Sequence, residues 1–163
     1  MKTIFLIRHA KAEQPNETIA DIDRPLNIKG NMDAHFMRTA MKLKKFPPDA
    51  IITSPAVRAI TTALIFARSL DFSAARISIV PKLYQPGEDN YLSIIAETDS
   101  KINTLLLFAH NPQITNTANA LTSEVIDHVP TCGIIGITND YDTWETFVTG
   151  KGKLILFDHP KKA

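Results

Sequence analysis

The chain alternates between short apolar runs and longer segments in which apolar residues recur at helical spacing. The apolar runs have the length and β-branched content of buried strands, and most are followed by a helical segment. This alternation predicts a three-layer α/β/α sandwich around a mostly parallel sheet. We expect strands at 3–7, 50–53, 76–80, 104–109, 133–138 and 153–158, and helices at about 27–45, from 55 onward, at 90–96 and at 112–121.

The end of the chain departs from this alternation. The last two expected strands have no helix between them, which favours an antiparallel edge to the sheet. Residues 144–148 are a candidate for a further strand beside them. The length suits one hydrophobic core, so we expect a single domain over residues 1–159 and a disordered tail over residues 160–163.

The helical segment near residue 27 has the period of an amphipathic helix. Asn27 can cap its N-terminus. Met32, Phe36 and Met37 recur at spacings near one helical turn, which predicts an apolar face.

Composition narrows the class of protein without naming a function. The chain has 163 residues, of which 44% are hydrophobic, and its 18 basic residues nearly balance 17 acidic ones. No overall field therefore favours nucleic acid or a membrane surface as a partner, and no apolar stretch approaches the roughly 18 residues of a membrane span. The apolar run 4–7 is too short for a signal peptide. The single cysteine, Cys132, excludes an internal disulfide and fits a reducing compartment, so we expect a cytoplasmic protein.

Basic residues follow three of the expected strands at the point where each strand ends. Arg8 and His9 follow the first strand, Arg58 follows the second in the first turn of a helix, and His110 follows the fourth. Ligands of open α/β sheets bind outside the carboxyl ends of the strands. We therefore expect two arginines and two histidines to converge on one site. Asn111, beside His110, is a further candidate for binding a substrate.

This combination of residues suits the transfer of a phosphoryl group. Guanidinium groups match the equatorial oxygens of a phosphoryl group in pairs, and helix N-termini add backbone N–H donors. A neutral imidazole can attack phosphorus and form a phosphohistidine that water hydrolyses. A second imidazole can stabilise the charge that develops in the transition state. One Arg-His pair would be weak evidence, but three strand ends together predict a phosphatase.

The same residues resemble the histidine phosphatase superfamily, which has the phosphoglycerate-mutase-like fold. Its Arg-His-Gly signature is present as Arg8-His9-Ala10, with alanine in place of glycine. Within that family the chain resembles the SixA-type phosphohistidine phosphatases. The matching stretches cover nearly the whole chain and include residues 8–12, 23–26, 54–59, 83–88 and 109–112.

The resemblance implies a role for each candidate residue. His9 would be the nucleophile, Arg8 and Arg58 would bind the phosphate, and His110 would complete the pocket. Arg24 would be a substrate-binding residue at the rim, or would only fix its loop through an ion pair, and both interpretations remain open.

One position departs from the family pattern. Many members carry an acidic residue two positions after a leucine as proton donor, and here Leu83 is followed at that spacing by Gln85. General acid catalysis is typically worth about 10²–10⁴-fold. The lack of an acidic residue at this position would slow the departure of an alkoxide more than the departure of an imidazole. The glutamine therefore favours phosphohistidine as the substrate. Glu88, Asp23 or solvent remain candidates for supplying the proton.

The expected partner is a phosphorylated protein, such as a histidine phosphotransfer domain. Two alternatives remain: a phosphomonoesterase that acts on a small phosphorylated metabolite or phosphoserine, and a non-catalytic phosphoryl-binding module. His35, His128 and His159 lack the spacing of metal ligands, so no metal site is expected. No cofactor is expected either, because the arginines and His110 already supply positive charge.

Overall fold

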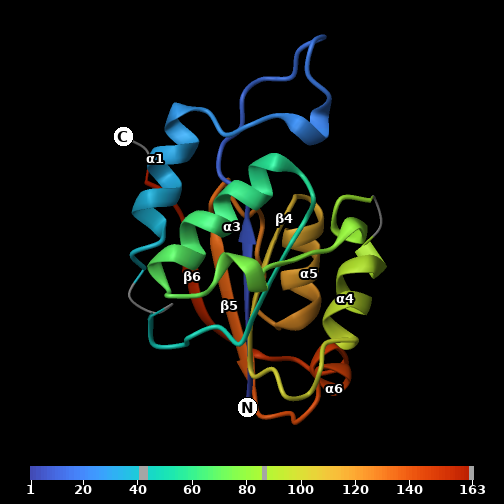
Figure 1. Ribbon diagram of the computed structural model, residues 1–163. Helices are drawn as coiled ribbons and strands as arrows, with labels where there is room; N and C mark the ends of the chain where they lie inside the picture. The colour runs from blue at the N-terminus through green and yellow to red at the C-terminus, as the bar shows by residue number, and fades with distance from the viewer. Residues whose placement is uncertain (41–43, 86–87, 162–163) are drawn as a thin grey trace.

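Six strands of the described chain form one mixed sheet, in the order β3-β2-β4-β1-β5-β6 (Figure 1). The computed structural model describes residues 1–40, 44–85 and 88–161, without the side chains of residues 88 and 89. Pairs among β1, β2, β3 and β4 are parallel, whereas β5 pairs antiparallel with β1 and with β6. The mostly parallel sheet with an antiparallel edge is thus confirmed. The strands are β1 (Lys2–Arg8), β2 (Ala50–Thr53), β3 (Ser78–Ile79), β4 (Thr104–Ala109), β5 (Ile134–Asn139) and β6 (Lys153–Asp158).

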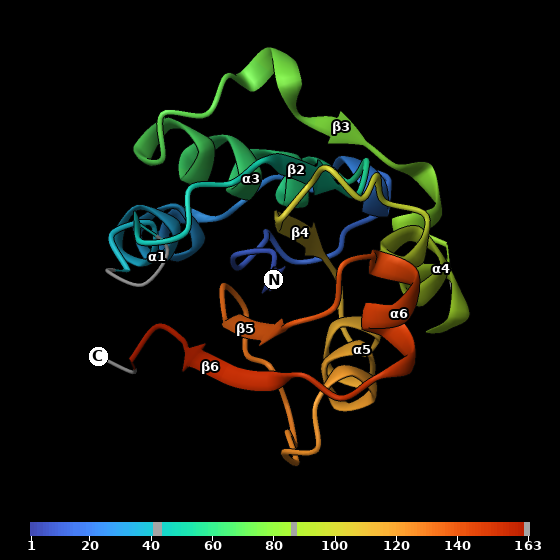
Figure 2. The same cartoon turned by 90° about the horizontal axis from the view of Figure 1, so that it is seen from below.

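Helices cover both faces of this sheet, which confirms the three-layer sandwich (Figure 2). One face carries α1 (Ile28–Met37) and α3 (Val57–Ser69), and the other carries α4 (Glu88–Ala96), α5 (Gln113–Leu121) and α6 (Trp144–Thr149). Short 3₁₀ helices lie in the connections at η1 (Asp21–Asp23), η2 (Ala74–Arg76) and η3 (Pro81–Leu83). No helix among residues 1–40, 44–85 and 88–161 combines the length and the apolar content needed to cross a membrane.

Side chains of the central strand β1 alternate between two cores. Ile4 and Leu6 pack with α4, α5 and α6, whereas Phe5 and Ile7 pack with α1 and α3. All four are fully buried. Because burying one such side chain contributes roughly 1.5–3 kcal/mol, a strand covered on both faces is apolar at successive positions. This is why β1 stands out in the sequence as an uninterrupted apolar run.

The helix α1 begins as predicted and ends early. Asn27 Oδ1 accepts a hydrogen bond from the Gly30 backbone N–H at 2.7 Å, so the expected cap is present. The helix ends at Met37 because residues 38–39 form a turn, and the expected continuous helix to residue 45 is therefore wrong. Residues 41–43 lie outside the described part of the chain.

The apolar residues of α1 do not share one buried face. Met32 and Phe36 are 67% and 66% exposed, whereas Ala34 is fully buried. The helix packs through the side that carries Gly30, where an added Cβ would lie only 2.0 Å from the Lys11 carbonyl oxygen. This close approach to the chain after β1 turns Met32 and Phe36 outward.

Residues 144–149 form the helix α6 rather than the expected strand. Thr143 caps the helix, since its Oγ1 accepts from the Thr146 backbone N–H at 3.2 Å. Trp144 and Phe147 are both fully buried. Three residues apart, they would point to opposite faces of a strand but share one face of a helix. Trp144 Nε1 also donates to the Ile102 carbonyl at 2.8 Å, which satisfies its only polar atom.

Candidate active site

The carboxyl ends of β1, β2 and β4 meet at one edge of the sheet, as predicted. β4 lies between the other two strands, and its Ala109 pairs with Arg8 of β1. His9 and His110 each follow the last residue of their strand, and their ring centroids lie 5.1 Å apart. The parallel arrangement therefore brings together residues that are about one hundred positions apart in sequence.

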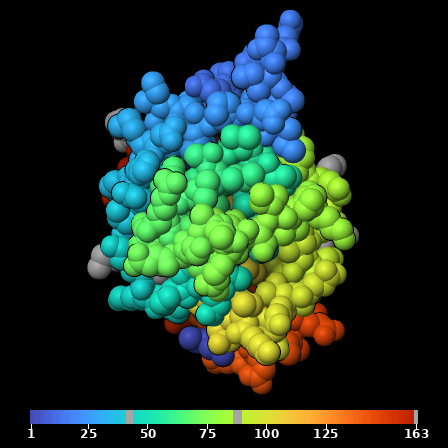
Figure 3. Space-filling view, in the orientation of Figure 1, coloured from blue at the N-terminus to red at the C-terminus, as the bar shows by residue number. Residues whose placement is uncertain are grey.

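These strand ends border a cavity of about 530 Å³. The loop that joins β1 to α1 lies at the same end of the molecule and projects beyond its body (Figure 3). All the residues expected at the site line this cavity: Arg8, His9, Arg24, Arg58, His110 and Asn111. The predicted convergence of these residues is thus present in the structure.

His9 is held as a neutral imidazole. Its Nδ1 lies 2.7 Å from the Ala10 carbonyl oxygen, and because a carbonyl can only accept, Nδ1 must carry the proton. Burial is the main cause that lowers the pKa of His9 to about 3; the hydrogen bond to Ala10 raises it, and the nearby His110 and the two arginines lower it further. The Nε2 lone pair is therefore available to attack an electrophile at neutral pH.

His110 is also uncharged at neutral pH. Burial, followed by the nearby charge of Arg58, lowers the pKa of His110 to about 4. Its Nε2 lies 2.7 Å from the Ser54 hydroxyl oxygen, and its backbone N–H donates to the Tyr91 hydroxyl at 3.3 Å. A bound phosphoryl dianion would offset the arginine charges, so His110 can take up a proton as the anion binds.

Arg8 and Arg58 each have a buried Nε that lacks a partner among the described residues. Arg8 Nη1 donates to the Val129 carbonyl at 3.0 Å and lies 3.4 Å from His128 Nε2. Arg58 is only 6% exposed, so its guanidinium cannot turn freely to water. A buried N–H without a partner is costly, and both arginines line the cavity in which an oxyanion would bind.

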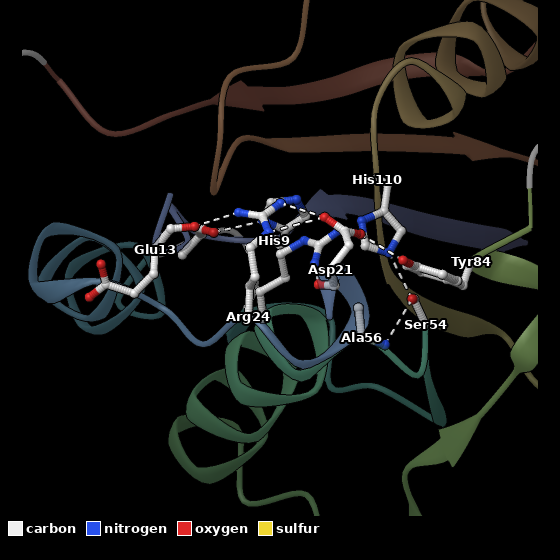
Figure 4. A network of polar contacts seen from close by, with 10 residues as sticks. His9, Glu13, Asp21, Arg24, Ser54, Ala56, Tyr84 and His110 are labelled. Atoms are coloured by element: carbon white, nitrogen blue, oxygen red, sulfur yellow. Dashed lines mark hydrogen bonds and ion pairs between the residues drawn. The ribbon is translucent and has the colours of Figure 1, made fainter. Parts of the chain in front are cut away.

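Arg24 forms the ion pair of its loop that one interpretation expects, and a contact between Arg24 and a substrate stays a prediction. It lines the cavity, and its Nε and Nη2 donate to Asp21 Oδ1 at 3.0 and 2.9 Å. Figure 4 shows the Asp21 carboxylate between the Arg24 guanidinium and the Tyr84 hydroxyl. Arg24 is therefore both a residue of the cavity wall and a partner in the ion pair of its loop.

The Asn111 side chain forms hydrogen bonds to other residues of the protein. Its Nδ2 donates to the Val129 carbonyl at 2.8 Å, and this carbonyl is the one that also binds Arg8. Its Oδ1 accepts from the Thr115 backbone N–H at 3.2 Å and from the Thr115 hydroxyl at 3.0 Å. The side chain thus holds the segment that orients Arg8. A direct contact between Asn111 and a substrate stays a prediction.

Four polar residues of this site were not predicted from the sequence. Ser54 and Tyr84 lie within the matching motifs but were assigned no role. Asp21 precedes Arg24 by three positions, and this spacing of opposite charges was its only local signal. His128 left no signal, because 120 positions separate it from Arg8.

Two other kinds of chemistry have no support at this site. Burial raises the pKa of the Cys132 thiol to about 12, so it stays protonated at neutral pH and is a poor nucleophile. Within the described ranges, no three His, Cys, Asp or Glu side chains are grouped closely enough to hold a metal ion. The expectation that the reaction needs no metal or cofactor stays a prediction.

Comparisons with known proteins agree with this geometry. The family model described as "histidine phosphatase superfamily (branch 1)" matches residues 4–84. A candidate phosphohistidine phosphatase, SixA from Agrobacterium tumefaciens, is 25% identical with a TM-score of 0.82, and the match covers 98% of this chain and 99% of that one.

Two further structures share the fold at lower identity. The protein histidine phosphatase SixA in complex with tungstate has a TM-score of 0.76 at 20% identity, over 96% of both chains. A mycobacterial glucosyl-3-phosphoglycerate phosphatase has a TM-score of 0.73 at 12% identity, over 99% of this chain and 100% of that one. The sandwich is thus the phosphoglycerate-mutase-like fold that the motifs implied. The family match spans the first strand, the loop above the cavity and the helix that carries Arg58. The chain therefore belongs to the histidine phosphatase superfamily.

Proposed function

We propose that this chain removes a phosphoryl group from phosphohistidine in a protein, by way of a phosphohistidine intermediate on His9. The family makes it a phosphatase with a histidine nucleophile. The observation that carries the proposal is the neutral His9, whose Nδ1 is protonated and whose Nε2 is left as the nucleophile in a cavity shared with Arg8 and Arg58.

In the first step His9 Nε2 attacks phosphorus, and the bond from phosphorus to the substrate nitrogen breaks. Arg8 and Arg58 would hold the equatorial oxygens, and His110 would donate to them once the anion has raised its pKa. If the second ring nitrogen of the substrate is protonated, the imidazole leaves in its neutral form. One phosphorus–nitrogen bond then replaces another, and no net proton transfer is needed.

In the second step water attacks phosphorus and the bond to His9 Nε2 breaks. The proton lost by the water stays with the inorganic phosphate, and the electron pair of the broken bond returns to Nε2. The hydrogen bond from Nδ1 to the Ala10 carbonyl can persist through both steps, because Nδ1 keeps its proton throughout. The free enzyme is thereby regenerated in the tautomer with which it began.

Two ionisable groups of the cavity, Asp21 and Tyr84, are poorly suited to protonate an alkoxide, whereas Glu13, which also lines the cavity, stays a candidate donor. The hydrogen bond from Tyr84 is the largest cause that lowers the pKa of Asp21, so this carboxylate stays ionised. The Tyr84 hydroxyl donates to Asp21, and its pKa is raised. Asp23 is not among the residues that line the cavity, and the side chain of Glu88 lies outside the described part. These features support a phosphoramidate, whose imidazole leaves without a general acid.

A small phosphorylated metabolite is the second candidate substrate. The fold that the chain shares with glucosyl-3-phosphoglycerate phosphatase favours it. Phosphate release from a phosphohistidine protein and from sugar phosphates, measured side by side, separates the two substrates. Faster turnover of the sugar phosphates would contradict the phosphohistidine proposal.

The covalent step is tested by replacing the nucleophile. We expect His9→Ala to abolish phosphate release and the labelled enzyme intermediate, which should be labile in acid and stable in base, as phosphoramidates are. The matched control is His35→Ala, since His35 is exposed on α1 and does not line the cavity. Undiminished turnover in His9→Ala would refute the mechanism. A phosphorylated phosphotransfer domain as partner and a cytoplasmic location belong to the same proposal and rest on the sequence.

A further inference from the structure

Asp21 joins three segments of chain around the cavity. Its Oδ1 accepts two hydrogen bonds from Arg24, as described above. Its Oδ2 accepts from Arg58 Nη2 at 3.1 Å and from the Tyr84 hydroxyl at 2.6 Å. Its backbone carbonyl accepts from Arg58 Nη1 at 2.7 Å. The loop after β1, the helix α3 and the turn at η3 thus meet at one residue (Figure 4).

These contacts fix the orientation of the Arg58 guanidinium. Both of its terminal nitrogens bind Asp21, one through the carboxylate and one through the backbone. A planar fork held at two points cannot rotate about its long axis. Two of its five N–H groups are used in this way, so Nε, which is buried and without a partner among residues 1–40, 44–85 and 88–161, and one N–H on each terminal nitrogen remain as donors for an anion.

Tyr84 extends the same contacts to the second histidine. Its ring lies edge-on to His110, with centroids 5.7 Å apart, while its hydroxyl is bound to Asp21. A tyrosine tied at its hydroxyl cannot swing away from the histidine it touches. The position of the His110 ring is therefore linked to the loop that carries Asp21.

We propose that Asp21 is a positioning residue for phosphoryl binding, because it holds Arg58 and Arg24 in the orientation that receives the anion. Tyr84 acts through its hydrogen bond to Asp21. This inference rests on the proposed function, because it assumes that the cavity binds a phosphoryl group. It adds to that function the loop between β1 and α1, which carries Asp21 and thereby becomes part of the binding site.

A negative charge beside an anion site also repels the anion, so two effects of opposite sign compete. The Asp21 side chain is 51% exposed, and water screens the repulsion of an exposed carboxylate. The hydrogen bonds to Arg58, by contrast, end on a side chain that is 7% exposed. Positioning should therefore outweigh repulsion, and removal of the charge should weaken binding.

Binding of inorganic phosphate and of vanadate to the full chain, measured by calorimetry, tests this sign without a known substrate. We expect Asp21→Asn to raise the dissociation constant on the order of tenfold, the loss that one charge-assisted hydrogen bond brings. Tyr84→Phe should raise it by about three- to tenfold. The matched control is Asp33→Asn, because Asp33 also pairs with a basic residue but does not line the cavity.

The double variant separates positioning from a general loss of structure. If Tyr84 acts through Asp21, Asp21→Asn combined with Tyr84→Phe binds no more weakly than Asp21→Asn alone, whereas independent structural damage would add. Tighter binding by Asp21→Asn would overturn the inference and make Asp21 a competitor of the anion. Unchanged binding would overturn it as well. If Asp21→Asn does not fold in a thermal melt, Tyr84→Phe removes one contact of Asp21 and keeps its charge, so unchanged or tighter binding by this variant would overturn the inference.

The two proposals fail in different ways. If wild-type protein binds neither phosphate nor vanadate, the proposed function is wrong. If the wild type binds both and the variants bind equally well, the proposed function stands and the role of Asp21 is wrong.

Discussion

The rings of His9 and His110 lie 5.1 Å apart at an interplanar angle of 57°. Two imidazoles this close would repel each other if both were charged, and burial further lowers the pKa of each. Both rings are therefore neutral at neutral pH, so His9 can act as a nucleophile and His110 can accept a proton when a substrate binds.

This pair predicts a pH dependence of stability. The pKa values of the folded protein, about 3 for His9 and about 4 for His110, lie below the ordinary value of 6.5. Below pH 6.5 the unfolded chain takes up protons that the folded protein does not, so stability should fall as the pH drops toward 4. The limiting slope is about 1.4 kcal/mol per pH unit for each ring. Melting temperatures between pH 7.5 and pH 5 measure it.

Two comparisons test whether the histidines of the site cause this pH dependence of stability. Saturating inorganic phosphate should reduce the slope, because the anion favours the charged form of His110. His110→Gln should also reduce it, whereas the exposed His35→Ala should leave it unchanged. An equal slope in wild type and His110→Gln would mean that other groups dominate.

The geometry of Arg58 predicts that lysine cannot replace it. Lysine carries its three N–H donors on one nitrogen, so it cannot reproduce the planar arrangement in which two separate nitrogens of Arg58 bind Asp21 while other N–H groups stay free for the anion. We expect Arg58→Lys to lower kcat/KM by about 10²-fold, the size of effect that loss of one transition-state donor brings. Arg68→Lys is the control, since Arg68 is exposed on the same helix. A change of less than twofold in Arg58→Lys would contradict the assignment.

Asn111 offers a test between scaffolding and direct binding. Asn111→Ala removes the hydrogen bond to the Val129 carbonyl and those to Thr115. Leaving such buried groups unpaired costs about 1–3 kcal/mol each, so we expect a lower melting temperature together with weaker phosphate binding. Weaker phosphate binding at an unchanged melting temperature would instead favour a direct contact with the substrate.

Much of the site could be predicted because its main residues follow buried strands. A strand covered on both faces, such as β1, shows itself as an apolar run, and the residue after it must lie at the edge of the sheet. Arg8, His9 and His110 were placed in this way, and Arg58 followed from the first turn of the next helix.

The rest depended on tertiary contacts that leave no local pattern. Asp21 lies over the cavity because of the path of a polar loop, and no periodicity describes such a path. Trp144 and Phe147 were assigned to a strand by their apolar character, although their spacing fits one face of a helix. Met32 and Phe36 were expected on an apolar face, but the close approach of Gly30 to Lys11 decides which side of α1 is buried.

The strand order of the sheet bears on how the enzyme is made. β1 lies between β4 and β5, and its Thr3 pairs with Thr104 on one side and Thr138 on the other. His9 precedes both strands that flank β1, because β4 begins at residue 104 and β5 at residue 134 and both are therefore synthesised after it. The strand that ends beside His9 is thus paired on both sides only after residues 134–139 have been synthesised. A nascent or truncated chain carries the catalytic sequence without an assembled active site.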